Sequence, residues 1–434
     1  MRFTQRELGK GMRLHLCETD KFKSLTCKVF IRQDLQAKNA TSTALLPLLL
    51  RRGSQKFPST LHIARELEDL YAAEFGVDIL KIGEQQILEL YMQMVDPSLV
   101  PQGERLLERG LKAFWEICTQ PQGPSDRFMD SYFEQEKSTL EQELKGLVND
   151  KNSYALARFV ALMCANEPFG IYKSGDLENL RQLENRDVYG HYQTLLAKHP
   201  IDIFCVGPNL EEVARLFTSL IPSHDHTIEL ELPQTIQVTE ERFFEETMNF
   251  NQAVLVMGYR TNCSYRDKDY YALLVGNGVL GGFAHSKLFM NVREKASLAY
   301  SVGSHIEGSK GLLTITAGIS DDQQEKALAI IGEQVSACQA GQISADELEQ
   351  TKRGLISAMT SLHDSPTGII DRNLIGVVEG EMRTIDQVVD AIRRVEYDDC
   401  VRVMEKIQLD TTYILRPGDS QNTIDEKGSN HGEN

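Results

Sequence analysis

One short segment decides how the fold of this chain is understood. It reads NVREKASLAYS, from Asn291 to Ser301. Apolar residues recur at helical spacing up to its middle and an apolar stretch follows, so the pattern predicts a helix that runs into a strand. Arg293 and Tyr300 would then converge on one groove, where a guanidinium and a phenol can both hydrogen-bond a peptide carbonyl. The alternative is an ordinary surface ion pair for Arg293 and a tyrosine packed under the sheet.

Length and composition describe a globular protein of more than one domain. The chain has 434 residues, of which 41% are hydrophobic and 25% are charged, which suffices for two or three domains with buried cores. Its formal net charge is −17. Nucleic acids and anionic membranes attract clustered lysine and arginine, so this balance predicts neither of them as a partner.

The sequence also indicates a cytoplasmic location. The first residues, MRFTQRELGKGMRLHL, contain no apolar segment of the kind that a signal peptide carries. No stretch approaches the roughly 18 apolar residues of a membrane-spanning helix. Eight cysteines are scattered along the chain without a Cys-x-x-Cys pair. In a chain without a signal peptide, such cysteines are typically reduced and mostly buried.

A similar order of elements runs through the chain twice. In each half, short strands alternate with long amphipathic helices. The strands are predicted at residues 25–31, 86–95, 201–206, 253–259, 312–318 and 412–415. We therefore predict an α+β fold of two similar α/β-sandwich halves, each a mixed, mostly antiparallel sheet covered by helices, related by internal duplication. The alternative is that two unrelated α+β domains share this order.

Composition places the domain boundaries. Residues 1–222 form a predicted N-terminal domain, and residues 241–417 form a C-terminal domain that carries Arg293 and Tyr300. Residues 223–240 are polar and are predicted to link the two. Residues 418–434 are polar and contain no aromatic residue, so we expect a disordered tail.

Several motifs together resemble those of a known family over nearly the whole chain. They are FKS at 22–24, ALLPLLLRRGS at 44–54, LEDLY at 67–71, LGGFAHSKLF at 280–289 and the segment from Arg293 to Ser301. The chain resembles the pitrilysin or insulinase type of metallopeptidase (inverzincins), in its two-domain bacterial form. Within it, the chain is similar to a zinc-motif-less subgroup called YfmF-like, which is linked by name to modification of an elongation factor. The resemblance implies that Arg293 and Tyr300 bind substrate.

The resemblance also identifies what this chain has lost. Inverzincins bind zinc with two histidines four residues apart on a helix, and the glutamate before the second histidine activates water. Alignment on residues 52–54 puts Ala44 and Leu48 at the histidine positions and Pro47 at the glutamate position. None of these side chains can coordinate a metal or move a proton. Pro47 also predicts a helix that is kinked or begins late.

Other candidate metal or catalytic groups are weaker. Glu136 and Glu143 match the glutamates of the family's downstream helix, but without histidines we expect solvated charges or hydrogen-bond acceptors rather than ligands. His224 and His226 form a close pair without a third fixed ligand. His285 lies beside Gly281–Gly282 and could line a groove. No Gly-x-Ser-x-Gly motif, Walker loop or dinucleotide fingerprint is present.

The main hypothesis is a non-catalytic, substrate-binding subunit of a heterodimeric zinc metallopeptidase. Its partners would be a zinc-bearing paralogous subunit and a peptide or unfolded protein substrate. The chain itself would hold no cofactor, because zinc is expected on the partner only. One alternative is a peptide-binding or scaffold protein without a hydrolytic role, involved in elongation-factor modification. Another is a self-sufficient metallopeptidase whose site is not recognised from the sequence.

Overall fold

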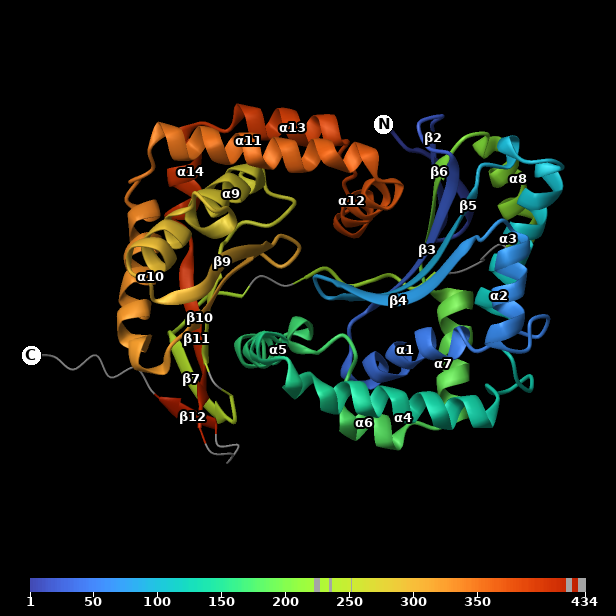
Figure 1. The fold of residues 1–434 in the computed structure, drawn as a ribbon, viewed down its shortest axis with the longest axis horizontal. Coiled ribbons are helices and arrows are strands. Elements are labelled where there is room, and N and C mark those ends of the chain that lie inside the picture. Colours follow the sequence, from blue (N-terminus) through green and yellow to red (C-terminus); the bar gives the residue numbers. More distant parts are fainter. Residues whose placement is uncertain (222–226, 234–235, 251, 419–423, 428–434) are drawn as a thin grey trace, which may run out of the picture. The chain divides into compact units, whose positions relative to one another are not determined.

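A computed structural model describes residues 1–221, 227–233, 236–250, 252–418 and 424–427 (Figure 1). The chain divides into two compact units, each treated separately below. Unit 1 contains Met1–Gly146, Ile171–Leu232 and His363–Leu374, and unit 2 contains Leu147–Gly170, Pro233–Leu362 and Ile375–Asn434.

Unit 1 is built on a six-stranded sheet with the order β1-β2-β6-β3-β5-β4. The strands β2 and β6 are parallel, and the other neighbouring strands are antiparallel. The strands are β1 (Thr4–Gly9), β2 (Met12–Glu18), β3 (Ser24–Asp34), β4 (Glu74–Ile82), β5 (Gln85–Val95) and β6 (Ile201–Gly207). The strands predicted at 25–31 and 201–206 lie within β3 and β6, which confirms them.

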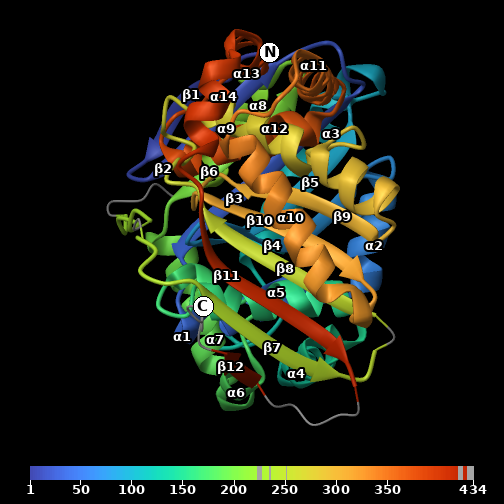
Figure 2. The same cartoon turned by 90° about the vertical axis from the view of Figure 1, so that its left-hand side faces the viewer.

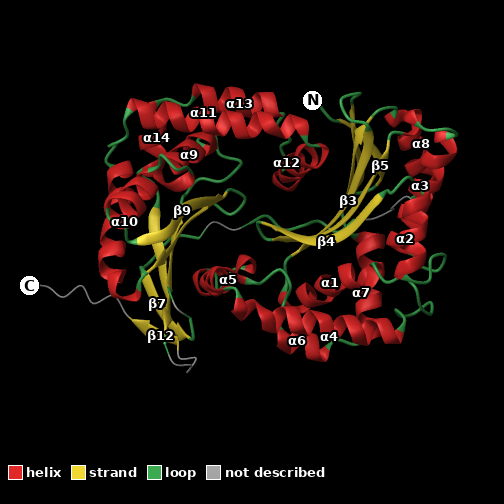
Figure 3. Ribbon diagram, viewed as in Figure 1, coloured by secondary structure: helices red, strands yellow, loops and turns green. Residues whose placement is uncertain are grey.

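Helices cover one face of this sheet (Figure 3). They are α1 (Ala37–Leu50), α2 (Thr60–Asp69), α3 (Gly103–Thr119), α4 (Asp130–Gly146), α6 (Leu177–Gln182), α7 (Asn185–Lys198) and α8 (Leu210–Leu220). Successive residues of a strand point to opposite faces. Val29, Leu90 and Ile203 accordingly join the core against the helices. Phe30 and Phe204 are also fully buried, and their rings contact each other 5.8 Å apart outside that core.

Unit 2 repeats five strands of this sheet in the same order, and its sixth strand, β12, comes from the C-terminal end of the chain. Its order is β12-β7-β11-β8-β10-β9, with β7 and β11 parallel and the other neighbours antiparallel (Figure 2). The chain order β2 to β6 thus corresponds to β7 to β11, which supports the predicted duplication. The strands are β7 (Arg242–Met248), β8 (Ala253–Arg260), β9 (Ala299–Glu307), β10 (Leu312–Ile319), β11 (Gln408–Pro417) and β12 (Ile424–Lys427).

One face of this second sheet carries the apolar core of unit 2. The helices of the unit are α9 (Tyr270–Asn277), α10 (Gln324–Gln339), α11 (Ala345–Ser361), α13 (Ile385–Arg394) and α14 (Tyr397–Met404), with the π-helical segments η4 (Gly278–Gly282) and η5 (Phe289–Lys295). Leu255, Met257 and Ile315 point from the strands into this core. Two similar α/β sandwiches, the predicted fold class, are therefore confirmed.

The two halves of the sequence exchange one helix each, which the predicted boundaries did not include. Helix α5 (Lys151–Met163) belongs to unit 2, although its sequence precedes the linker. Most of α12 (Pro366–Glu379) belongs to unit 1, where Asp371 pairs with Lys28 of β3 at 2.7 Å. The physical reason is the burial of apolar surface. Phe159 and Met163 of α5 pack on the faces of β8 and β11 that the other helices leave uncovered. Units defined by packing therefore differ from the segments 1–222 and 241–417.

The linker and the tail are only partly described. Residues 227–233 and 236–240 have no regular secondary structure, and 222–226 and 234–235 lie outside the described residues. The prediction of a disordered tail over 418–434 is wrong at Ile424–Lys427, which form β12 against β7. A free strand edge presents unpaired N–H and C=O groups to any segment that can reach it. Residues 419–423 and 428–434 lie outside the described ranges.

Two further expectations concern cysteines and membranes. All eight cysteines are free and buried, as predicted. Among the described residues, no helix has the length and apolar character needed to cross a bilayer.

Replacing Gly258 tests how α5 packs on β8. A Cβ at Gly258 would stand 2.3 Å from Phe159 Cζ and 2.5 Å from Met163 Sδ, so Gly258→Val should displace α5 from β8. We expect a loss of about 1–3 kcal/mol in the free energy of unfolding. Urea denaturation measures the loss, and hydrogen exchange of α5 should accelerate.

Gly332→Ala in α10 is the matched control, because no atom lies within 4 Å of a Cβ there. This change should leave stability unchanged or raise it by about 0.4–1 kcal/mol. Equal stability of Gly258→Val and the wild-type chain would contradict the described packing of α5.

Candidate functional site

Arg293 lies on η5, and its positive charge makes only a long ion pair. Its guanidinium carbon lies 4.7 Å from the centre of the Phe289 ring, and its side chain is 44% exposed. The carboxylate of Glu294 approaches it only to 3.8 Å. No hydrogen bond of the Arg293 guanidinium is found among the described residues. Stacking on Phe289 therefore orients this side chain and leaves its N–H donors available.

Tyr300 projects from a bulge on the edge strand β9. Ala299 pairs with Ile319 and Ser301 pairs with Gly318, so Tyr300 is the extra residue between the two pairs. A β-bulge of this kind re-aims a side chain. Tyr300 is 67% exposed, and its hydroxyl makes no hydrogen bond within the described part of the chain. The alternative of a tyrosine packed under the sheet is therefore wrong.

A tight turn joins these two residues. Ser297 has a φ of 52°, in the left-handed region, and the N–H of Leu298 donates to the carbonyl of Val292 at 3.0 Å. The chain thus reverses from η5 directly into β9, and η5 packs against that strand. The predicted helix-to-strand order is confirmed, although the helix is π-helical. Such segments are rare and often occur at functional sites.

The glycine-rich stretch before η5 packs against β9. A Cβ at Gly281 would stand 2.7 Å from the backbone nitrogen of Ser304, so only glycine permits this approach. His285 stacks on Phe283 and its Nε2 lies 3.1 Å from the hydroxyl of Thr351 on α11. His285 therefore anchors the loop to α11.

The degenerate metal positions lie on or near α1 and offer no ligand. Ala44 and Pro47 are buried in the helix, and Leu48 is half-buried. The helix starts at Ala37, so the prediction that Pro47 delays its start is wrong. Thiolates, imidazoles and carboxylates bind zinc, and none of these three positions carries one.

Arg52 supplies the positive charge beside Glu136. Its Nη1 lies 3.3 Å from Oε1 of Glu136, its Nη2 donates to Gln135, and its guanidinium stacks 4.7 Å from the Tyr132 ring. Burial raises the pKa of the Glu136 carboxyl, and the charge of Arg52 opposes the rise. Glu143 is exposed. The residues here therefore do not fit a zinc ion.

The described residues contain no cluster of three or more potential metal ligands. The pair His224 and His226 lies outside them. A metal site within the described part of the chain is therefore not supported.

A groove that the sequence did not predict lies between α5 and the strands β9 and β10. It has a volume of about 470 Å³. Leu156, Phe159, Val160 and Met163 of α5 form its apolar wall. The opposite side is formed by β9 and β10, mostly by small polar residues together with Glu307 and Leu312. No local signal reveals it, because its wall comes from the exchanged helix.

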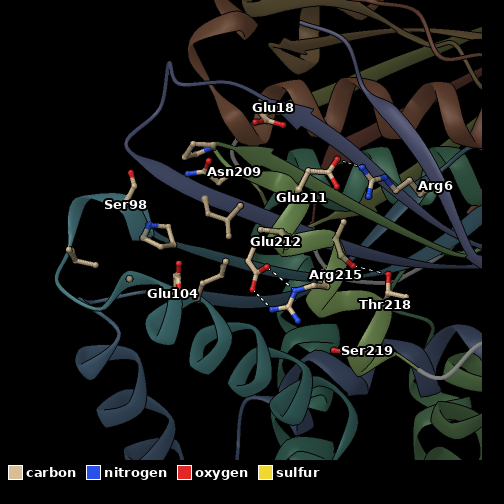
Figure 4. Close-up of a pocket in the computed structure, with 18 residues that line it drawn as sticks. Arg6, Glu18, Ser98, Glu104, Asn209, Glu211, Glu212, Arg215, Thr218 and Ser219 are labelled. Atoms are coloured by element: carbon tan, nitrogen blue, oxygen red, sulfur yellow. Dashed lines mark hydrogen bonds and ion pairs between the residues drawn. The ribbon is translucent and has the colours of Figure 1, made fainter.

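A larger hollow in unit 1 is a weaker candidate (Figure 4). It measures about 1260 Å³ and lies beside the first turns of α3 and α8. Its two arginines are already paired inside it: Arg6 with Glu211, and Arg215 with Glu212, where Nε lies 2.8 Å from Oε2. Both positive charges of this hollow are therefore already engaged, and the lining also carries the carboxylates of Glu18 and Glu104.

Known proteins are similar to this chain in sequence and in fold. The family model described as "Peptidase M16 inactive domain" matches residues 182–355. "Probable inactive metalloprotease YmfF" of Bacillus subtilis (strain 168) is 32% identical over 408 residues, 94% of this chain and 96% of that protein. "Uncharacterized zinc protease YmxG" of the same strain is 30% identical over 150 residues, 34% of this chain and 36% of that protein. A conserved protein from Enterococcus faecalis V583 has a TM-score of 0.88 at 28% identity, covering 97% of this chain and 100% of that one.

The purified chain should bind no zinc of its own. Elemental analysis should find far less than one zinc per chain, and a chelator should leave the melting temperature unchanged, because positions 44, 47 and 48 carry no ligand. Arg52→Ala should also bind no zinc while losing about 1 kcal/mol of stability, since Arg52 is a third exposed. Stoichiometric zinc in the wild-type chain would contradict this account of α1.

Proposed function

This chain belongs to the M16 peptidase family as an inactive homologue, and we propose that it is the non-catalytic, substrate-binding subunit of a two-chain zinc peptidase. One contrast carries the proposal. The metal positions on α1 hold no donor and Arg52 holds Glu136, whereas Tyr300 stays exposed and without a hydrogen bond in the described residues. Half of a peptidase site is thus lost and the other half is presented to solvent.

The chemistry left to this chain is the binding of a peptide carbonyl. The hydroxyl of Tyr300 donates one hydrogen bond and the guanidinium of Arg293 donates up to two in parallel. Such donors stabilise a carbonyl oxygen most strongly when it becomes negatively charged during hydrolysis. The zinc and the base that activates water would come from the partner chain, which would be a zinc-bearing paralogue.

The similarity to a zinc protease supports the choice of partner. YmxG, whose name describes it as a zinc protease, shares 30% identity with this chain over 150 residues. Soluble assemblies most often pair two copies of one fold about a twofold axis, and two related chains of the same fold can pair in a similar way. A protease of this type is therefore the partner that we expect to complete the site.

The groove under α5 favours a second candidate, a peptide-binding or scaffold protein without a hydrolytic role. Its apolar wall needs no metal to hold a side chain. In this version Arg293 and Tyr300 only bind, and the client would be a protein under modification, such as an elongation factor. Retained physiological function with a partner whose zinc glutamate is replaced would favour this candidate.

Substitution of the two donors tests the main proposal. The chain should co-purify at native level with a zinc-bearing M16 protein, and peptide hydrolysis should require both chains. Tyr300→Phe and Arg293→Ala in this chain should each lower the turnover of the complex by about 10-fold to 100-fold, since each removes a donor to the developing oxyanion.

Tyr172→Phe and Arg393→Ala are matched controls, because both side chains are exposed and lie on other elements. They should leave turnover unchanged. Full activity of the complex with Tyr300→Phe and Arg293→Ala combined would overturn the proposal.

A further inference from the structure

Helix α5 leaves one part of the sheet of unit 2 uncovered. Along β9 and β10, the residue pairs Ser301 with Gly318, Gly303 with Thr316 and His305 with Thr314 share one face. Helix α5 packs on β8 and β11 but leaves this face open, and Thr316 and Ser301 are exposed. We call these six residues the floor. It carries no lysine, arginine, aspartate or glutamate.

Contacts within the chain do not explain why two positions of the floor are glycine. A Cβ at Gly303 would meet only the Gly281 carbonyl oxygen at 3.4 Å, and one at Gly318 only the Ser301 hydroxyl at 3.3 Å. Neither glycine has a positive φ. Glycine inside a strand costs about 0.5–1 kcal/mol, and it commonly marks the close approach of a ligand or another backbone. Gly258 differs, because there α5 itself excludes a side chain.

The groove under α5 continues from this floor. Gly303, His305, Thr314 and Thr316 line both. On the other wall Leu156 is 41% exposed, so its side chain is accessible to a ligand in the groove. The floor therefore leads into a slot that suits one large apolar side chain.

Tyr300 stands at the other end of β9. At about 3.3 Å per residue, the groove residues from Gly303 to Glu307 lie roughly 10–23 Å along the strand from it. Among the described strands, none pairs with the outer edge of β9. An extended polypeptide that runs along β9 can hydrogen-bond to this edge through its main chain and direct alternate side chains over the floor.

We propose that an uncharged, extended polypeptide segment lies on the floor and places a large apolar side chain, such as leucine, in the groove under α5. This proposal deepens the proposed function, on which it rests, by naming the substrate class. The apolar residue would stand about three to seven positions from the residue held at Tyr300. A charged residue at that position would be disfavoured, because Glu307, the one carboxylate that lines the groove, already interacts within the chain, and burying a charge against the apolar wall is costly.

Peptide binding to the full chain tests this selectivity. The probes are three fluorescein-labelled peptides of serine, threonine and glycine that differ at one central position, which is Leu, Ser or Lys. Fluorescence anisotropy should show the Leu peptide binding at least tenfold more tightly than the other two. Equal binding of the Leu and Ser peptides would overturn the proposal.

Variants of the floor and the groove localise the effect. Gly303→Val and Leu156→Ser should each weaken binding of the Leu peptide at least tenfold, while Gly332→Ala should not change it. Urea denaturation should show Gly303→Val to be about as stable as the wild-type chain, because the only atom within 4 Å of the new Cβ is the Gly281 carbonyl oxygen, at 3.4 Å. Unchanged peptide binding by Gly303→Val would overturn the proposal.

Two further outcomes separate this inference from its alternatives. If Tyr300→Phe lowers turnover of the two-chain complex but Gly303→Val does not, the floor fails while the proposed function stands. If Tyr300→Phe has no effect but Leu selectivity persists, the proposed function fails and the floor stands. A change in oligomeric state of Gly303→Val without peptide, measured by sedimentation, would identify a second copy of this chain as the occupant and overturn the peptide proposal.

Discussion

The packing of α5 on β8 at Gly258 is the contact on which the site depends. Both faces of β8 and β11 are apolar, so the second face must be covered as well as the first. The chain meets this demand with a helix from its other half. Because α5 lies over β8 and β11 only, it leaves β9 and β10 open and forms the wall of the groove beside them. Covering the core and creating the site are therefore one packing event.

The lost metal site obeys a similar constraint. A buried carboxylate requires a counter-charge or a proton, because desolvation opposes ionisation. Glu136 is buried, and without zinc the guanidinium of Arg52 takes the role of the cation. Returning histidines to positions 44 and 48 would therefore not by itself rebuild a zinc site, since Arg52 would have to leave first. The region that corresponds to the lost metal site is therefore closed by its own ion pair between Arg52 and Glu136.

Periodicity and motif resemblance predicted the parts of this fold that are determined locally. The strands at 25–31 and 312–318 and the helix-to-strand turn ending at Tyr300 follow from side-chain alternation within short windows. The exchange of α5 could not be predicted that way, because its partner strands, β8 and β11, lie about 100 and about 250 residues further along the chain. The bulge at Tyr300 depends on pairing with β10, and β12 on an edge presented by β7. Each of these three features involves a non-local contact.

The exposed edge of β9 shows why binding and protection use the same features. A regular open strand invites pairing with other chains, and proteins blunt such edges with bulges and breaks. The bulge at Tyr300 interrupts the ladder at one end of β9, and Gly303 weakens the strand in its middle. Uncontrolled association is thereby disfavoured, because a long flat partner cannot match the register. A short extended segment with one apolar anchor still gains the groove under α5.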